Sequence, residues 1–280
     1  MHFKKLVLTG AAGRLGGYLR ETLAGMCDQL VSTDIAASLD DLAANETYVS
    51  ADLGVLDQIV PIMEDADMVV HVGAIADEAP WNAILHANLI GSFNIWEAAR
   101  IQGVRRVVYA SSIHAVGLHR ISDNIGVDAP HNPDSYYGLA KCFAEDCAKL
   151  YWNKEGIEAV CMRIYSCAAP NGPRSLQAWL SVDDLIRLVV ASLTTPVVDV
   201  TVVYGISNNT RAALNNDGAA HLGYKPQDNA EDYAAEIFAA ADAPDRNDPA
   251  QTKYAGVFAN TKLGQSGLAF MNAVDEKTGK

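Results

Sequence analysis

Short apolar segments alternate along this chain with longer segments of helical periodicity, and this alternation limits the possible folds more than any other feature. Seven segments rich in Val, Ile and Tyr predict strands, at residues 5–10, 29–35, 47–52, 68–74, 105–112, 158–164 and 200–205. They are mostly apolar throughout, which is typical of strands buried on both faces of a parallel sheet. The segments between them predict helices at residues 13–25, 56–66, 82–103 and 137–156. Strand–helix alternation of this kind predicts an α/β fold, a Rossmann-like doubly wound parallel sheet.

The regular alternation weakens after residue 165. A chain of 280 residues is long enough for one large α/β domain. We therefore expect a single Rossmann-type domain over 1–280, with a dinucleotide-binding core over about 1–165 and substrate-side segments and C-terminal elements over about 166–280. The later part contains one clear helical segment, 180–193, and a polar loop at 242–248. Its irregular segments are expected to cover the carboxyl edge of the sheet.

Charge and cysteine usage argue against several classes of partner. The chain has 34 acidic and 21 basic residues and a formal net charge of −13, so it repels nucleic acid and anionic membranes. No apolar run approaches the ~20 residues needed to cross a bilayer. The five cysteines form no C-x-x-C pair and are odd in number. This favours reduced thiols in the cytoplasm over a disulfide framework, and it predicts no metal site.

A glycine motif lies where the first predicted strand meets the first helix. The sequence TGAAGRLG places Gly10, Gly13 and Gly16 at this junction. Glycine permits the tight turn and lets a pyrophosphate approach the backbone, while the helix N-terminus offers free N–H groups. A tight turn without a ligand is the alternative. The position of the motif in the first βαβ unit favours a dinucleotide site.

Asp34 ends the second predicted strand, where a carboxylate would bind the adenosine ribose hydroxyls and repel a 2′-phosphate. Arg14 argues for NADP, because an arginine in the glycine loop can meet that phosphate. The repulsion acts directly on the added group, so we expect NAD. A helix or turn cap is the alternative role for Asp34. The other expected cofactor contacts follow the glycine loop and the ends of the strands: Ala12, Leu15, Ile35, Asp52, Leu53, Gly73, Ala74 and Ser111.

A serine, a tyrosine and a lysine form the predicted catalytic set. Ser112 ends the fifth predicted strand, at the edge where open α/β sheets bind their ligands. Tyr137 and Lys141 lie four residues apart in the following helix and therefore share a face. A phenolate at Tyr137 could remove a proton from an alcohol while hydride passes to a nicotinamide. We expect the Lys141 ammonium to lower the phenol pKa from its usual ~10, and Ser112 to hold the substrate oxygen.

These motifs together resemble the extended short-chain dehydrogenase/reductase superfamily. Within it, the segments YYGLAKCFAED (136–146), RIYSC (163–167) and LGYKPQDNAE (222–231), with R-x-x-x-x-W-L-S-V-D-D at 174–184, are similar to the bacterial NAD-dependent uronate dehydrogenases. The resemblance covers about residues 4–260. It implies oxidation of the anomeric hydroxyl of a hexuronic acid, such as glucuronate or galacturonate, to the aldarolactone, with Tyr137 as the base. It also implies cofactor contacts at Asn88 and Ile164 and association into homo-oligomers.

The same resemblance implies a substrate site that matches the family only in part. Arg174 corresponds to the arginine that binds the sugar's carboxylate, a task suited to the paired donors of a guanidinium. Three neighbours depart from the family: Ala76 replaces a serine, Ile113 an asparagine and Tyr165 a glycine. The paired tryptophans usual near the end of the chain are replaced at 212–214. The expected substrate contacts are Ala76, Ser112, Ile113, His114, Tyr137, Tyr165, Ser166 and Arg174.

These departures leave two further functions open. The same mechanism could serve a neutral aldose, a deoxysugar or another hydroxyl compound, because each lost hydrogen bond to a buried substrate hydroxyl changes discrimination by roughly 1–3 kcal/mol. A protein that binds NAD without turnover is the other possibility. The complete set of Ser112, Tyr137 and Lys141 argues against it, since a pure binder has no use for an activated phenol.

Overall fold

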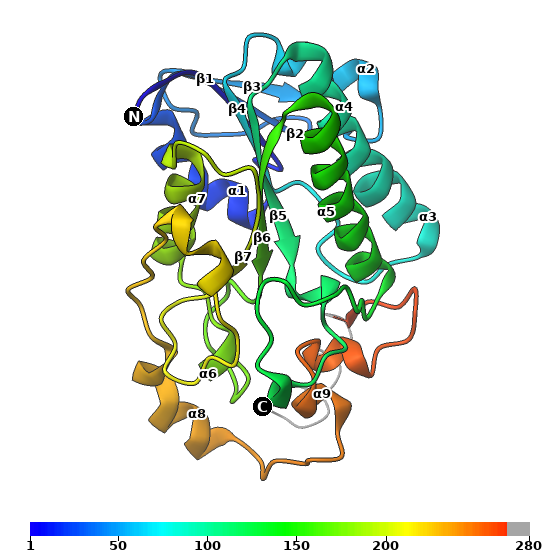
Figure 1. Ribbon diagram of the computed structural model, residues 1–280, viewed down its shortest axis with the longest axis vertical. Coiled ribbons are helices and arrows are strands. Elements are labelled where there is room, and N and C mark those ends of the chain that lie inside the picture. Colours follow the sequence, from blue (N-terminus) through cyan, green and yellow to red (C-terminus); the bar gives the residue numbers. More distant parts are fainter. Residues whose placement is uncertain (268–280) are drawn as a thin grey trace.

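The computed structural model describes residues 1–267 and contains a central seven-stranded sheet flanked by helices (Figure 1). The strand order is β3-β2-β1-β4-β5-β6-β7, and every pair of neighbours is parallel. This confirms the predicted doubly wound parallel sheet. The strands are β1 (Phe3–Thr9), β2 (Cys27–Asp34), β3 (Glu46–Ser50), β4 (Met68–His71), β5 (Arg106–Ser112), β6 (Glu158–Ile164) and β7 (Val200–Gly205).

Two helical layers cover the sheet, one on each face (Figure 1). Helices α1 (Arg14–Ala24) and α7 (Val182–Thr194) lie on one face, and α4 (Gly91–Gln102) and α5 (Tyr136–Glu155) lie on the other. Alternate residues of β1 show the arrangement: Leu6 and Leu8 pack in the cluster that contains α1 and α7, whereas Val7 packs with α4 and α5. Both faces of the strands are therefore buried, as their continuous apolar sequences predict.

Two of the predicted helices are interrupted. The segment predicted at 56–66 forms only α2 (Leu56–Ile59) and a 3₁₀ turn (Pro61–Met63), because Pro61 has no N–H to continue an α-helix. The segment predicted at 82–103 starts as α3 (Trp81–Ile84), passes through a π-helical turn (Leu85–Ile90) and continues as α4. This π-helical turn lies beside the candidate active site.

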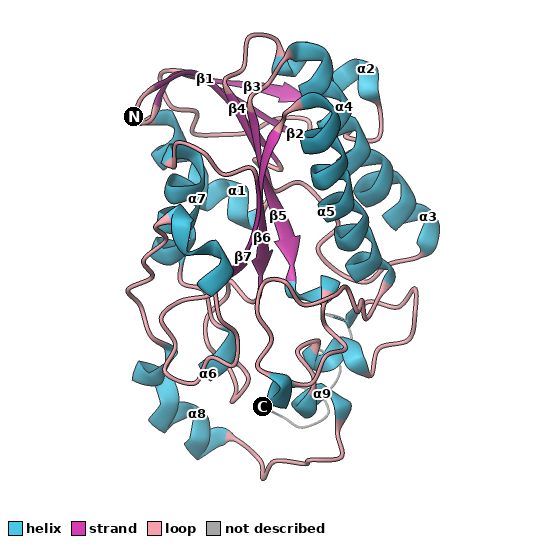
Figure 2. Ribbon diagram, viewed as in Figure 1, coloured by secondary structure: helices cyan, strands magenta, loops and turns pink. Residues whose placement is uncertain are grey.

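The later part of the chain completes the sheet and covers one of its ends. Strand β7 is the edge strand, so the sheet extends beyond the expected core at 1–165. Helices α6 (Ser175–Ala178), α8 (Ala234–Ala240) and α9 (Pro249–Thr252) gather beyond the carboxyl ends of β5, β6 and β7 (Figure 2). Further 3₁₀ turns lie at Ile113–Ala115, Ile121–Asp123, Asp217–Leu222, Ala230–Tyr233 and Gly256–Ala259. Late segments thus lie over the carboxyl ends of β5, β6 and β7.

Residues 1–267 contain no helix long and apolar enough to cross a membrane. Over the same range, no group of three or more His, Cys, Asp or Glu side chains is arranged to hold a metal ion. All five cysteines are free thiols and are buried.

Candidate active site

The glycine loop joins β1 to α1 at the carboxyl edge of the sheet. Gly10 has a φ of +75°, and a Cβ on it would lie 2.5 Å from the Cα atom of Gly73, in the turn after β4. A Cβ on Gly16 would lie 2.2 Å from the carbonyl oxygen of Gly10. Gly13 is the N-cap of α1, and the first turn of this helix has neither a capping side chain nor an acidic residue. Its free N–H groups therefore suit a pyrophosphate, as the motif predicts.

Asp34 lies at the end of β2, next to the glycine loop. Its Oδ2 atom accepts a hydrogen bond from the backbone N–H of Ala12 (3.1 Å), and its Oδ1 atom accepts one from Ala36 (3.3 Å). Asp34 therefore stabilises the turn, the role weighed as the alternative, but two hydrogen bonds leave acceptor capacity on a carboxylate. Arg14 is exposed. The position of Asp34 is compatible with binding of ribose hydroxyls.

The segments after β3 and β4 lie against each other. A Cβ on Gly73 would approach Cδ1 of Leu53 to 2.9 Å, so the two predicted cofactor positions are in contact. His86 donates a hydrogen bond from Nε2 to the Asp52 carboxylate (2.9 Å), and this bond holds the pKa of Asp52 below its ordinary value. The carbonyl oxygen of Leu53 accepts a hydrogen bond from Asn94 (2.7 Å). These contacts fix the segments after β3 and β4 at the carboxyl edge of the sheet.

Asn88 lies in the π-helical turn and is buried. Its side-chain oxygen accepts a hydrogen bond from the N–H of Ile75, and its amide nitrogen donates one to the Ile75 carbonyl oxygen, both at 2.9 Å. The two polar atoms of the Asn88 side chain therefore hold the backbone of Ile75, in the loop after β4 that also carries Ala74 and Ala76. π-Helical turns occur frequently at functional sites, and this one directs Asn88 towards the loop.

The structure brings the predicted catalytic side chains together. Ser112 ends β5, and its hydroxyl lies close enough to the Tyr137 phenol on α5 to lower the pKa of that phenol. The Nζ atom of Lys141 lies 5.5 Å from the centre of the Tyr137 ring. Nζ donates hydrogen bonds to the carbonyl oxygen of Ala110 (2.7 Å) and the hydroxyl of Tyr109 (3.3 Å). All three predicted side chains are buried.

The pKa of Tyr137 differs from the prediction. Burial raises the pKa of this phenol to about 12; the nearby hydroxyl of Ser112 opposes the rise, and the carboxylate of Asp134 adds to it. Burial also lowers the pKa of Lys141 to about 7. The predicted lowering of the phenol pKa is therefore wrong for the protein on its own, because desolvation of Tyr137 outweighs the nearby ammonium.

Ser111 has a different role from its neighbour. Its hydroxyl donates a hydrogen bond to Oε1 of Glu145 on α5 (2.6 Å), so its side chain belongs to a buried ion cluster. Glu145 also accepts two hydrogen bonds from Arg163 (2.8 and 3.0 Å) and one from His131 (2.9 Å). The hydroxyl proton of Ser111 is therefore not available for the expected cofactor contact. The sequence motifs did not predict a role for Glu145, although its position four residues after Lys141 places it on the same helix face.

Two further carboxylates near Tyr137 were also missed. Asp134 accepts a hydrogen bond from Nδ1 of His114 (2.7 Å), whose ring lies 5.5 Å from that of Tyr137. Glu78 accepts the backbone N–H of Tyr137 (3.0 Å) and that of Gly264 (2.7 Å). The position of Asp134 just before the start of the catalytic helix was a usable signal. No sequence signal pointed to Glu78, because its partner Gly264 lies 186 residues away along the chain.

The predicted substrate residues lie at the carboxyl ends of β5 and β6. Arg174 is the N-cap of α6, and its Nη2 atom donates a hydrogen bond to the carbonyl oxygen of Tyr254 (2.7 Å). Its guanidinium carbon lies 4.5 Å from the centre of the Tyr165 ring. Tyr165 and Ile113 are buried in one apolar cluster, and Ser166 pairs with Trp179 in an isolated parallel bridge. Arg174, which matches the family, therefore contacts Tyr165, and Tyr165 shares its cluster with Ile113, both of which depart from the family.

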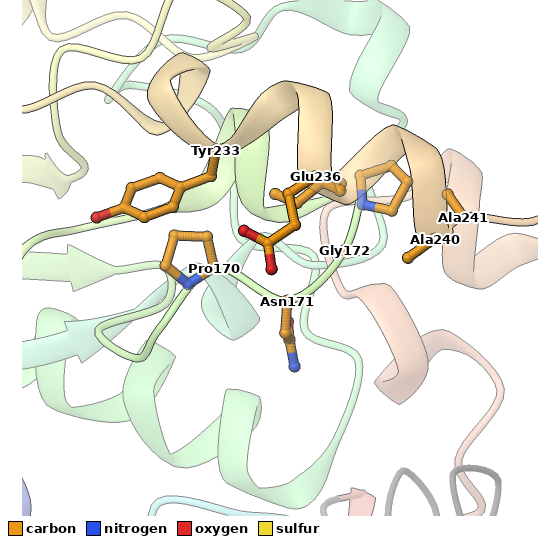
Figure 3. A pocket seen from close by; sticks show the side chains of 9 residues that line it. Pro170, Asn171, Gly172, Tyr233, Glu236, Ala240 and Ala241 are labelled. Atoms are coloured by element: carbon orange, nitrogen blue, oxygen red, sulfur yellow. The ribbon is translucent and has the colours of Figure 1, made fainter. Parts of the chain in front are cut away.

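A separate hollow lies beside the loop that leads to Arg174 (Figure 3). Glu236 of α8 directs its carboxylate towards this loop, and it is the only charged residue among the lining ones. A sugar acid would be repelled there. The lining residues are Pro170, Asn171, Gly172, Pro173, Tyr233, Glu236, Ile237, Ala240 and Ala241.

Comparison with known proteins agrees with this geometry. A sequence profile of the NAD dependent epimerase/dehydratase family matches residues 6–179. The uronate dehydrogenase of Pseudomonas putida is 41% identical, over 92% of this chain and 96% of that protein. The crystal structure of the Agrobacterium tumefaciens uronate dehydrogenase has a TM-score of 0.90 at 38% identity, over 95% of this chain and 100% of that one. A mutant of that enzyme complexed with NAD gives 0.88 at 38% identity, over 92% and 98%. The chain therefore belongs to the NAD-dependent epimerase/dehydratase family, in the group that contains the uronate dehydrogenases.

Proposed function

We propose that this protein is an NAD-dependent dehydrogenase that oxidises the anomeric hydroxyl of a free hexuronic acid to the aldarolactone. The observation that carries the proposal is the 41% identity to a uronate dehydrogenase over 92% of the chain. Arg174, at the start of α6, supplies the guanidinium that the resemblance assigns to the sugar's carboxylate. The NAD requirement follows from the family, and the geometry of the glycine loop agrees with it.

Four parts of the carboxyl edge would bind the parts of NAD. The uncapped N-terminus of α1 would bind the pyrophosphate. Gly10 and Gly16 allow the backbone of the loop to pack against Gly73 and against itself, which gives the loop its shape. Asp34 would bind the adenosine ribose hydroxyls, and Lys141 those of the nicotinamide ribose. The turn after β4, held by Asn88, would form the floor. Bound NAD would supply the hydride acceptor for the oxidation of the anomeric carbon.

Ser112, Tyr137 and Lys141, all buried, would carry out the proton transfer. Ser112 would donate a hydrogen bond to the anomeric oxygen, and Tyr137 as phenolate would take its proton. A phenol of raised pKa is a strong base once it is ionised. The resulting negative charge favours the protonated form of Lys141, so the two groups titrate as a coupled pair.

The assignment is tested by NADH formation from a small panel of sugars. Glucuronate, galacturonate, glucose and galactose would each be given with NAD or NADP. We expect turnover of the two uronates with NAD, and an Arg174→Gln variant with a KM for uronates raised about tenfold or more and little change for any neutral sugar. Turnover of neutral sugars alone would contradict the uronate assignment.

A neutral aldose or deoxysugar is the second candidate. Ala76 and Ile113 can form no side-chain hydrogen bond to a sugar hydroxyl, and Ile113 is completely buried in an apolar cluster. The same panel distinguishes this candidate from the first, because a neutral substrate needs no partner for Arg174.

We also propose a cytoplasmic homo-oligomer whose subunits pair through α4 and α5. Both helices expose large apolar side chains, namely Phe93, Ile101, Leu139, Phe143 and Leu150. Light scattering would detect the oligomer, and charged substitutions at Phe93 and Phe143 should dissociate it. The free, buried thiols and the net charge of −13 support a reducing location and argue against nucleic-acid and membrane partners.

A further inference from the structure

We infer that Tyr165 and Arg174 together form the anion-binding end of the substrate site, with the Tyr165 hydroxyl donating a hydrogen bond to the carboxylate that Arg174 also binds. The inference rests on the proposed function, because it concerns the acid group of the same substrate. It makes Tyr165, one of the departures from the family, a residue that determines specificity.

The two side chains are held against each other. The Arg174 guanidinium lies over the Tyr165 ring, 4.5 Å from the ring centre, in a cation–π contact. Tyr254 fixes both partners: its carbonyl oxygen accepts the Nη2 hydrogen bond from Arg174, and its ring packs edge-on against Tyr165, 6.3 Å between centres. The pair therefore presents its polar atoms from a fixed support.

Each member of the pair has a buried polar atom without a partner. Within residues 1–267, the Tyr165 hydroxyl and Nε of Arg174 have no partner at hydrogen-bond geometry, although the Arg174 guanidinium lies close enough to oppose the rise in the pKa of the Tyr165 phenol. The other tyrosines of this apolar cluster are satisfied: the Tyr204 hydroxyl donates to Gly126 (2.9 Å) and that of Tyr254 to Ala213 (2.5 Å). Buried polar groups are rarely left unpaired in native proteins. Two such atoms on adjacent side chains are explained by a ligand that supplies acceptors.

The donors define the chemistry of that ligand. An N–H of a guanidinium and a phenolic O–H both require an acceptor, and the positive charge of Arg174 requires a negative one. Tyr165 lies in an apolar cluster that also contains Ile113, and a low-polarity surrounding of this kind strengthens such an interaction. Burial raises the pKa of Tyr165, so its hydroxyl stays protonated and able to donate. A carboxylate with two oxygens fits; a hydroxymethyl group would leave the guanidinium without a counter-charge.

The test removes the hydroxyl and keeps the ring. Tyr165→Phe retains the surface under the guanidinium, and Tyr204→Phe is the matched control, because it removes a buried hydroxyl with a structural hydrogen bond in the same cluster. The measurements are kcat and KM for glucuronate at saturating NAD, calorimetric binding of glucuronate to the NADH complex, and the Tm of the free protein.

We expect Tyr165→Phe to raise both KM and Kd for glucuronate about tenfold or more, with kcat changed less than about twofold and the Tm unchanged or raised. The Tyr204→Phe control should lower the Tm and leave KM unchanged. A structural role for the Tyr165 hydroxyl would instead lower the Tm without a selective rise in KM.

The outcomes separate this inference from the proposed function. If the wild-type protein oxidises glucuronate and Tyr165→Phe binds it equally well, the inference is wrong and the function stands. If the wild type binds glucuronate without oxidising it, and Tyr165→Phe binds it more weakly, the function fails and the inference stands. If neither glucuronate nor galacturonate binds or reacts, both are wrong.

Discussion

The Nζ atom of Lys141 donates its short hydrogen bond, of 2.7 Å, to the carbonyl oxygen of Ala110. Ala110 lies in β5, two residues before Ser112, so the lysine connects the catalytic helix to the strand that carries the catalytic serine. The same bond keeps Nζ beside Tyr137 rather than in solvent. The relative placement of the three side chains thus depends on a main-chain contact.

Replacing Tyr137 with Phe should abolish turnover and spare cofactor binding. Loss of the base should lower kcat by roughly 1000-fold, while the NAD dissociation constant changes less than about twofold. Tyr136→Phe is the control, since Tyr136 precedes the base and packs its ring against Trp81, 5.3 Å between centres. Stopped-flow NADH formation and calorimetric NAD titration would measure both effects. Equal losses in the two variants would argue against Tyr137 as the base.

Activity should increase with pH. The phenol pKa of about 12 leaves Tyr137 protonated at neutral pH, and the phenolate fraction rises as the pH increases towards that value. We therefore expect kcat/KM for glucuronate to rise steadily from about pH 6 to pH 9. Steady-state rates in overlapping buffers would show it, with stability checked at each pH. A rate that is highest at the acid end would contradict the assignment.

Lys141→Met should change how stability depends on pH. The folded pKa of about 7 lies below the ordinary value of 10.5, so between these values the unfolded chain binds the proton and the folded chain does not. The wild-type free energy of unfolding therefore rises with pH from about 7 to 10 through this group. The variant lacks that contribution, so the wild type should gain stability relative to it over this range. Urea unfolding at several pH values would measure the difference. If the free energies of unfolding of the two proteins change in parallel with pH, the pKa of Lys141 is not lowered in the folded protein.

Asp34→Ser should relax the preference for NAD. Removing the carboxylate removes the repulsion of a 2′-phosphate, so the ratio of kcat/KM for NAD to that for NADP should fall about tenfold or more. Asp40→Ser is a control for the change in net charge, because Asp40 is exposed in the segment between β2 and β3. An unchanged ratio for Asp34→Ser would assign the preference to other groups.

Glu145→Gln should be strongly destabilising. It leaves the buried Arg163 without its charge partner, which costs about 3–5 kcal/mol. The pKa of Glu145 is about 2, with burial opposing and His131 and Arg163 producing the fall, so its contribution is lost in acid below the ordinary value of 4.5. Glu231→Gln breaks an exposed pair with Arg211 and should cost less than about 1 kcal/mol. Urea unfolding of both variants compares the two pairs directly.

The sequence predicts the sheet well because burial on both faces requires long apolar runs, which are visible without any knowledge of partners. The glycine loop and the pair Tyr137 and Lys141 are equally visible, since their function depends on spacing within one element. The π-helical turn is not, because it depends on Asn88 reaching Ile75 in another segment. The raised pKa of Tyr137 also escapes prediction, as burial depends on the whole assembled site.

Two late residues, Tyr254 and Gly264, make contacts on which earlier parts of the active site depend. The Tyr254 carbonyl oxygen holds Arg174, and the N–H of Gly264 binds Glu78, whose other oxygen holds the first turn of the catalytic helix. The nucleotide-binding loop makes neither of these contacts, whereas Arg174 and the catalytic helix depend on residues that lie 80 to 186 positions away from their partners. Loss of the contacts at Tyr254 and Gly264 would therefore leave the nucleotide-binding loop intact and release Arg174 and the start of the catalytic helix.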